Sequence, residues 1–223
     1  MIEKLAQGIV VSCQSKPGGP LDNAHILSQL ARAAELGGAV GIRANLPHNI
    51  KAIKSAVSVP VIGIYKQEYT GSLVYITPTF KEAKMTIDAG ADIIAIDATL
   101  RTRPEGQGLP DLIQQIRNYS NVPIMADIAT LEEALAACEL GVDLIATTLL
   151  GYTEDTQGFR APDMELIQGL ASKVEIPVIV EGGVKSPEVA RMALKHGAFA
   201  VVVGTAITDI SWVTEQYVTT MAS

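Results

Sequence analysis

The stretch Pro177-Val178-Ile179-Val180-Glu181-Gly182-Gly183 is typical of a buried strand that ends on a carboxylate and then opens into two glycines. Two other stretches follow the same plan, because residues 60–66 run from a proline to Lys66 and residues 123–127 run from a proline to Asp127. Proline is tolerated at the first residue of a strand, where its missing N–H costs little. The pattern predicts three strands, each with a charged side chain at the end where the strand meets a ligand.

Apolar runs alternate with helical segments along the rest of the chain. Further strands are expected at residues 8–13, 39–42, 92–96, 143–147 and 200–203, and helices at 22–35, 47–57, 79–89, 109–119, 131–139, from 162, from 186, and at 205–221. This alternation predicts parallel βαβ units, and strands that are apolar throughout are buried on both faces. Eight such units predict an α/β fold, a (β/α)₈ TIM barrel formed by one domain over residues 1–223. A doubly wound open sheet is the alternative.

An internal repeat favours the barrel. Glycine before a small or apolar residue recurs roughly every 50 residues, at Gly37, Gly90, Gly141 and Gly197. The three proline-led strands fall between these glycines, so that each repeat holds two βα units. Local signals also set expected helix starts, with Asp22 as an N-cap and Pro162 as the first residue of the sixth helix.

Composition excludes several classes of function. The net charge of −7 does not suit a general nucleic-acid binder, which needs a basic face, although one local pocket can still be positive. The two cysteines, Cys13 and Cys138, are expected to be buried thiols rather than a disulfide. No segment has the pattern of a signal peptide or a membrane span, so a soluble cytoplasmic protein is expected.

The active site of such a barrel lies at the C-terminal ends of the strands. The residues expected at that rim are Gln14, Arg43, Lys66, Asp97, Asp127, Thr147, Glu181 and Gly204. Charged residues at strand ends can also simply face water. Lys66 and Glu181 favour a site because each of them closes an unbroken apolar run.

Glycines after strands seven and eight predict a phosphate site. Phosphate sites in these barrels are built from those two loops and a helix N-terminus, and glycine lets backbone N–H groups approach an anion. The candidates are Gly182, Gly183, Gly204 and Thr205. Ordinary turns are the alternative explanation for a single Gly-Gly pair, but two glycine sites at these two strand ends favour phosphate.

Other polar and aromatic residues receive no role in chemistry. The three histidines have no paired spacing, so no metal site is predicted. Arg101 and Arg103 are expected in a solvated loop, and they would touch substrate only if that loop folds inward. In the last helix, Trp212, Val213, Tyr217 and Val218 form an apolar stripe. This stripe is expected to pack on the barrel; the alternative is a partner chain, which would make the protein a homodimer. The long loop at residues 67–78 is a candidate lid.

With these residues in view, the chain resembles the N-acetylmannosamine-6-phosphate 2-epimerase family along essentially its whole length. The similar stretches include Tyr75-Ile76-Thr77-Pro78-Thr79 and residues 9–14, 41–44, 60–66, 96–99, 125–128, 147–153 and 203–208. The resemblance implies a phosphate-binding barrel that interconverts N-acetylmannosamine 6-phosphate and N-acetylglucosamine 6-phosphate in amino-sugar and sialic acid catabolism. It implies no organic cofactor and no metal.

The resemblance also implies roles for individual residues. Lys66 would abstract and return the proton and Glu181 would assist it, and the expected sugar contacts are Gln14, Arg43, Asp127, Thr147 and Tyr152. Two positions depart from the family pattern, since Gly183 and Asp209 stand where the family often has arginine. Either backbone N–H groups or a cation such as Lys185 would then hold the phosphate.

The chemistry leaves alternatives open. Inversion at C2 requires an open-chain aldehyde, a donor to the enolate oxygen and a base, and either one or two bases can serve. An aldolase with a Schiff base on Lys66 and a non-catalytic sugar-phosphate sensor are the competing functions.

Overall fold

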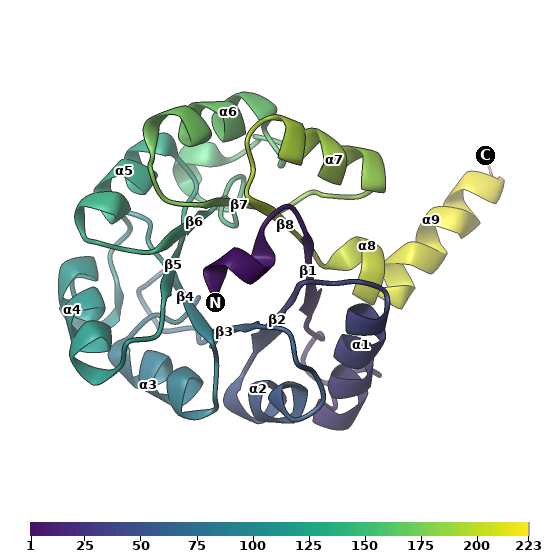
Figure 1. The fold of residues 1–223 in the computed structure, drawn as a ribbon, viewed down its shortest axis with the longest axis horizontal. Helices are drawn as coiled ribbons and strands as arrows, with labels where there is room; N and C mark the ends of the chain where they lie inside the picture. Colours follow the sequence, from purple (N-terminus) through teal and green to yellow (C-terminus); the bar gives the residue numbers. More distant parts are fainter. Residues whose placement is uncertain (223) are drawn as a thin grey trace.

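Eight parallel strands close into a barrel in the computed structural model, which describes residues 1–222 (Figure 1). The strands pair in chain order, with β1 also paired to β8. Their bounds are β1 Ile9–Cys13, β2 Gly41–Asn45, β3 Val61–Ile64, β4 Ile93–Asp97, β5 Ile124–Asp127, β6 Leu144–Ala146, β7 Val178–Glu181 and β8 Ala200–Val203. The predicted TIM barrel is confirmed and the open sheet is wrong. Ser223, the last residue of the expected domain, lies outside the described residues.

Helices surround the barrel and alternate with its strands (Figure 1). Their bounds are α1 Ala24–Leu36, α2 Pro47–Lys54, α3 Phe80–Asp88, α4 Leu109–Tyr119, α5 Leu131–Glu139, α6 Met164–Lys173, α7 Pro187–Lys195, α8 Thr205–Thr208 and α9 Ile210–Ala222, with short 3₁₀ helices at η1 Ile2–Leu5, η2 Pro104–Gly106 and η3 Glu154–Thr156. Apolar side chains fill the space between strands and helices, for example where Leu112 and Ile116 of α4 pack against Ile94 and Ile124.

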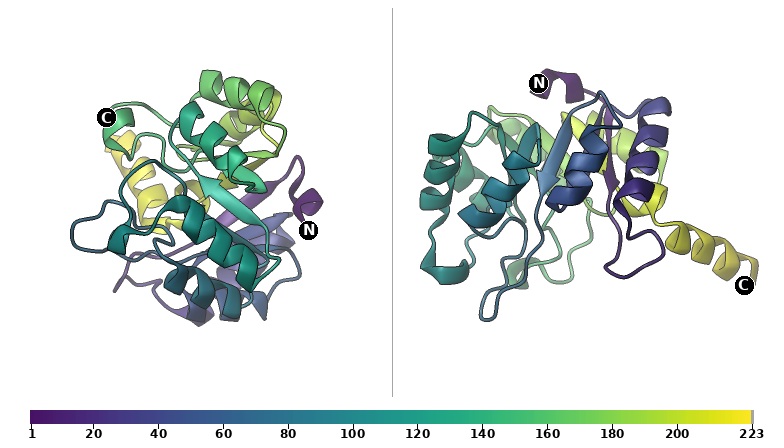
Figure 2. Two further views of the ribbon diagram at one scale, coloured as in Figure 1. Left: turned by 90° about the vertical axis from the view of Figure 1, so that its left-hand side faces the viewer. Right: turned by 90° about the horizontal axis from the view of Figure 1, so that it is seen from below.

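The barrel interior is closed at its N-terminal end. The short η1 crosses the centre of the barrel in Figure 1, and Leu5 is fully buried in the interior cluster with Val10, Ile62 and Leu144. Figure 2 (right) shows η1 at one end of the barrel and the long connecting loops at the other. A ligand therefore reaches the interior from the C-terminal ends of the strands.

Two predicted boundaries are wrong in ways that matter for the site. Strand β2 runs on to Asn45, so Arg43 lies inside the strand rather than at its end and is only 1% exposed. Helix α1 starts later than expected because Asn23 is its N-cap, and Asp22 instead accepts hydrogen bonds from Ser15 and Gly18 in the preceding loop.

The C-terminal segment also differs from prediction. The expected helix at residues 205–221 is two helices, α8 and α9, and α9 extends away from the barrel past α1 (Figures 1 and 2). No residue of α9 is buried, so the prediction that its stripe packs in the core is wrong. Helix α6 begins after Asp163, which caps it, so Pro162 precedes the helix. None of the described helices is long and apolar enough to cross a membrane.

Candidate active site

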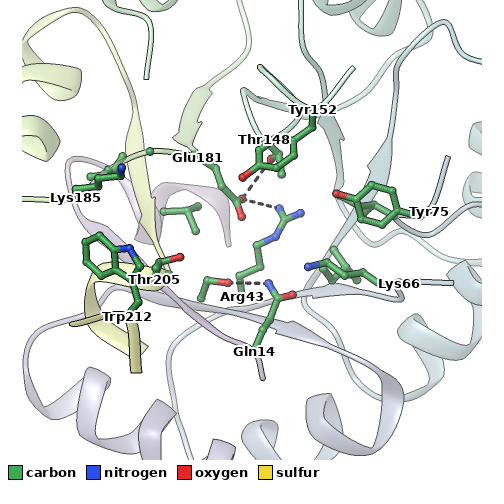
Figure 3. Close-up of a pocket in the computed structure, with 18 residues that line it drawn as sticks. Gln14, Arg43, Lys66, Tyr75, Thr148, Tyr152, Glu181, Lys185, Thr205 and Trp212 are labelled. Atoms are coloured by element: carbon green, nitrogen blue, oxygen red, sulfur yellow. Dashed lines mark hydrogen bonds and ion pairs between the residues drawn. The ribbon is translucent and has the colours of Figure 1, made fainter. Parts of the chain in front are cut away.

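A cavity of about 480 Å³ opens at the C-terminal ends of the strands (Figure 3). Its polar and aromatic lining comes from β1, β2 and β7, from the loops after β1, β3, β6, β7 and β8, and from α8 and α9: Ser12, Gln14, Arg43, Lys66, Tyr75, Thr148, Tyr152, Glu181, Lys185, Thr205 and Trp212, with the glycines Gly182, Gly183 and Gly204. Three of these side chains are basic and one is acidic. The cavity is thus locally positive in a protein whose net charge is −7.

Arg43 contacts two carboxylates in the floor of the cavity. Its two terminal nitrogens bind Asp127 at 3.2 and 2.5 Å, and Nη1 also lies 3.0 Å from Oε2 of Glu181. Burial alone would lower the pKa of Arg43, but the two carboxylates raise it above its ordinary value. A bidentate pair of this kind fixes the plane of the guanidinium. Arg43 therefore holds a permanent positive charge in the floor of the cavity.

Glu181, at the end of β7, faces the cavity beside Arg43. Its side chain is 15% exposed, and burial raises its pKa, against the opposing effect of Arg43. The Thr148 hydroxyl lies 2.7 Å from Asp127 and 3.3 Å from Glu181, so it bridges the two carboxylates. The Thr147 hydroxyl donates to the carbonyl of Glu181 and accepts from its N–H, which fixes the end of β7 against β6. Glu181 is therefore held in place, and its pKa is higher than that of an ordinary glutamate.

Lys66 approaches the same cavity from beyond β3, on the opposite side of the barrel from β7. Its backbone N–H donates to the side-chain oxygen of Asn45, and Lys66 itself forms an antiparallel bridge with Ile76. Lys66 is exposed as a residue, and its side chain lines the cavity between the barrel walls. Desolvation lowers the pKa of Lys66 and so does Arg43, and Glu181 and Asp127 oppose them. A lysine with a lowered pKa can serve as a base.

Tyr75 and Gln14 complete this end of the cavity (Figure 3). Burial raises the pKa of the Tyr75 phenol and so do Asp127 and Asp97, which keeps it protonated and able to donate. Gln14 donates to Ser12 at 2.7 Å. Among the described residues, Oε1 of Gln14 and Nε of Arg43 are buried without a hydrogen-bond partner. The cavity wall therefore has one hydrogen-bond acceptor and one hydrogen-bond donor that no other group in residues 1–222 satisfies.

The four residues predicted to bind phosphate all line the cavity. Gly182 and Gly183 have φ of 106° and 66°, and a Cβ on Gly183 would lie 1.7 Å from the carbonyl oxygen of Ala161. Position 183 therefore has no room for a side chain. Helix α8 begins after Gly204 as expected but has only four residues, so it is one short turn instead of the long helix that was predicted.

The structure brings together most of the predicted sugar-binding residues. Gln14, Arg43 and Tyr152 line the cavity, whereas Asp127 and Thr147 lie behind its wall and support Arg43 and Glu181. Asp97 is fully buried and pairs with Arg101 at 2.7 Å, away from the cavity lining.

The prediction that Arg103 is solvated is wrong, and Arg101 is only partly exposed because it pairs with Asp97. Arg103 is 5% exposed and donates to the carbonyls of Thr77, Pro78 and Asp97, because its loop folds against the segment that follows residues 67–76. Burial lowers its pKa to about 10.

Sequence reasoning gave no role in ligand binding to four polar or aromatic lining residues: Ser12, Tyr75, Thr148 and Trp212. A usable signal existed for Ser12, Tyr75 and Thr148, because each lies in a stretch that carried the family resemblance. No group of histidine, cysteine, aspartate or glutamate in residues 1–222 could hold a metal ion.

Known proteins with similar sequences agree on one family. A family profile described as "Putative N-acetylmannosamine-6-phosphate epimerase" matches residues 27–223. A relative from Caldanaerobacter subterraneus named "Putative N-acetylmannosamine-6-phosphate 2-epimerase" is 50% identical over 98% of this chain and 93% of its own.

Solved structures give the same answer. The N-acetylmannosamine-6-phosphate 2-epimerase from Clostridium perfringens superposes with a TM-score of 0.94 at 40% identity, covering 98% of this chain and 95% of its own. A thiamine phosphate pyrophosphorylase from Pyrococcus furiosus, at 19% identity and a TM-score of 0.65, shares the fold, with 96% of this chain and 92% of its own covered. From the family profile and the relatives together, the chain belongs to the N-acetylmannosamine-6-phosphate epimerase family.

Proposed function

We propose that this protein is an epimerase that inverts C2 of N-acetylmannosamine 6-phosphate to give N-acetylglucosamine 6-phosphate, in the amino-sugar breakdown that the family resemblance implies. The observation that carries the proposal is the placement of Lys66 and Glu181 on opposite sides of one cavity, with Arg43 between them. The substrate that the Clostridium perfringens relative is named for is an anion, and the cavity of this chain is locally positive.

The reaction needs a base for the C2 proton. That proton is acidic only when C1 is an aldehyde, so the ring must open first. Neutral Lys66 would then take the proton, and the electron pair would move onto the C1 oxygen. Positive Arg43 and the protonated phenol of Tyr75 would stabilise the enolate that forms. General-base help of this kind contributes roughly 10²- to 10⁴-fold in rate.

The proton must return on the other face of C2. Strands β3 and β7 lie across the barrel from each other, so a sugar between them would present opposite faces to Lys66 and Glu181. The raised pKa of Glu181 suits a group that gives up a proton. Glu181 would therefore supply the proton that completes the inversion, and exchange with solvent would then take the extra proton from Lys66 and return one to Glu181. Asp127 would act through Arg43 rather than touch the sugar.

Proton NMR in D₂O tests this function. N-acetylmannosamine 6-phosphate incubated with the protein should give the gluco epimer with deuterium at C2, with little deuterium in the remaining substrate at early times if two groups serve two faces. Unchanged substrate with no exchange would remove the epimerase from consideration, and a borohydride-trapped adduct on Lys66 would instead favour an aldolase.

We also propose that the protein is a homodimer joined through α9. That helix has no buried residue, and its large apolar side chains are exposed on a helix that stands away from the barrel.

A further inference from the structure

The cavity has two ends that differ in chemistry (Figure 3). Lys66 and Tyr75 lie at one end, and Lys185, Thr205 and Trp212 lie at the other, with Glu181 and Arg43 between them. Lys66 follows β3 and Lys185 follows β7, so the two lysines approach from opposite walls of the barrel. A hexose phosphate has the same polarity, with its reactive carbons at one end and its phosphate at the other.

The charge of Lys185 is not compensated by the protein. Lys185 forms no ion pair with any carboxylate in the described part of the chain, although it lines the cavity. Glu181, the carboxylate that also lines it, is already engaged by Arg43 and Thr148. The far end of the cavity therefore offers a free cation to an anionic group.

Trp212 is the one residue of α9 that lines the cavity, and Asp209 fixes its position. The carboxylate of Asp209 accepts a hydrogen bond from the backbone N–H of Trp212 at 3.0 Å, as an N-cap does, and its other oxygen lies 3.5 Å from Lys16. Figure 3 shows the indole nitrogen on the side of the ring toward Thr205. The indole N–H can only donate, which suits an acceptor such as a phosphate oxygen.

Local geometry also limits which positions at this end of the cavity can carry a cation. A side chain on Gly183 would collide with the backbone of Ala161, and Asp209 is committed to capping α9. Neither position can present a cation to the cavity, whereas Lys185, two residues after Gly183, reaches it.

We propose that Lys185 and Trp212 bind the phosphate monoester of the substrate, Lys185 as its cation and the Trp212 indole as a neutral donor beside Thr205 and the glycine backbone. The inference rests on the proposed function and assigns the residues that would make this enzyme select phosphorylated sugars. It also makes the first turn of α9 part of the substrate site.

The chain offers a direct readout because Trp212 is its only tryptophan. Inorganic phosphate titrated into the intact protein should change the tryptophan emission saturably, and calorimetric titration with phosphate should give the same affinity. Lys185→Gln should weaken that affinity at least tenfold and Lys185→Arg should restore most of it. Lys195→Gln, an equal change of charge on the exposed end of α7, is the matched control and should leave it within twofold.

Kinetics separate this inference from the proposed function. Lys185→Gln should raise KM for N-acetylmannosamine 6-phosphate at least tenfold, with a smaller effect on kcat, and should reduce the preference for phosphorylated over unphosphorylated sugar by a similar factor. Trp212→Phe should raise KM several-fold. An active epimerase in which neither change alters KM or phosphate affinity would overturn the inference alone. Phosphate binding that depends on Lys185 without any epimerisation would support the inference and sink the proposed function.

Discussion

At the residue scale, the proton chemistry depends on the charge that surrounds Lys66. Desolvation and Arg43 lower its pKa from the ordinary 10.5, so its neutral form becomes available at lower pH. Because the proposed mechanism uses neutral Lys66 and protonated Glu181, we expect a bell-shaped dependence of kcat/KM on pH, with its maximum between the pKa values of the two groups. Ionised Glu181 raises the pKa of Lys66, so Glu181→Gln should reduce the rate and leave a single limb, centred below 10.5, that rises with pH as Lys66 loses its proton. Lys66→Met should fold and lose at least about 10²-fold in turnover; full activity in that variant would exclude Lys66 as the base.

Asp127 belongs to the buried charge cluster around Arg43. It is fully buried and provides the bidentate partner of Arg43. Removing one member of a buried ion pair typically costs about 3–5 kcal/mol. Glu181 still contacts Arg43 at 3.0 Å, so Asp127→Ala should lower the free energy of unfolding by about 3 kcal/mol, and Asp127→Asn should lower it less. Urea unfolding at neutral pH measures both, and a loss below about 1 kcal/mol in the alanine variant would contradict this account.

These residues also show how far the sequence could reach. Gln14, Lys66 and Glu181 were identifiable because each directly follows or ends an apolar run, which is a one-dimensional signal. Asp127 follows the same rule, yet its carboxylate turns toward Arg43 and away from the ligand space. Whether a charged strand end faces a ligand or a neighbouring side chain depends on the partners that the barrel brings to it, and those partners are far away in the sequence.

At the element scale, close contact between β3 and its covering helices depends on a missing side chain. A Cβ on Gly63 would lie 2.6 Å from Thr86 of α3, 2.6 Å from Ala91 and 3.1 Å from Ile50 of α2. Overpacking of this kind costs about 1–3 kcal/mol. Gly63→Ala should reduce the free energy of unfolding by that amount, as measured by urea denaturation.

Gly169 provides the matched control for Gly63→Ala. It lies within α6, and a Cβ there would meet nothing within 4 Å. Alanine is favoured over glycine in a helix interior by about 0.8–1 kcal/mol, so Gly169→Ala should stabilise the protein. If both alanine variants shifted stability in the same direction, the packing explanation for Gly63 would fail.

The repeat of two βα units was readable in the sequence, with one shift. Helices α1, α3, α5 and α7 are each followed by a glycine with positive φ, at Gly38, Gly90, Gly141 and Gly197. The first of these is Gly38 rather than the expected Gly37. Gly37 is the C-cap of α1 and has a right-handed helical backbone conformation, with φ of −75°. The break between α8 and α9 could not be predicted, because it falls at Asp209 with no glycine or proline to signal it.

At the scale of the whole molecule, the two ends of the barrel differ, because one is closed by packed side chains and the other is open to a ligand. The interior is closed at one end by η1 and Leu5, and the loops after the strands form the cavity at the other. A protein of net charge −7 thus presents a small basic cavity at one end of its barrel.

The last helix, α9, extends away from the barrel (Figure 1), and none of its residues is buried. Four exposed apolar residues recur at helical spacing on α9 and form its exposed stripe. They are Ile210, Tyr217, Val218 and Met221, which are 57%, 69%, 62% and 85% exposed. This stripe carries no charge, so the same face of a second copy can pack against it without burying an unpaired ion, as two-fold interfaces require.

Light scattering after gel filtration should therefore give twice the chain mass of 23.6 kDa. Tyr217→Asp with Val218→Asp should shift the protein toward the monomer, whereas Thr219→Asp, off the stripe on the same helix, should not. A monomer at all accessible concentrations would rule out the homodimer. Because Trp212 lies in the first turn of the same helix, the dimer-breaking pair should also weaken phosphate binding if the partner helps to hold α9 in place.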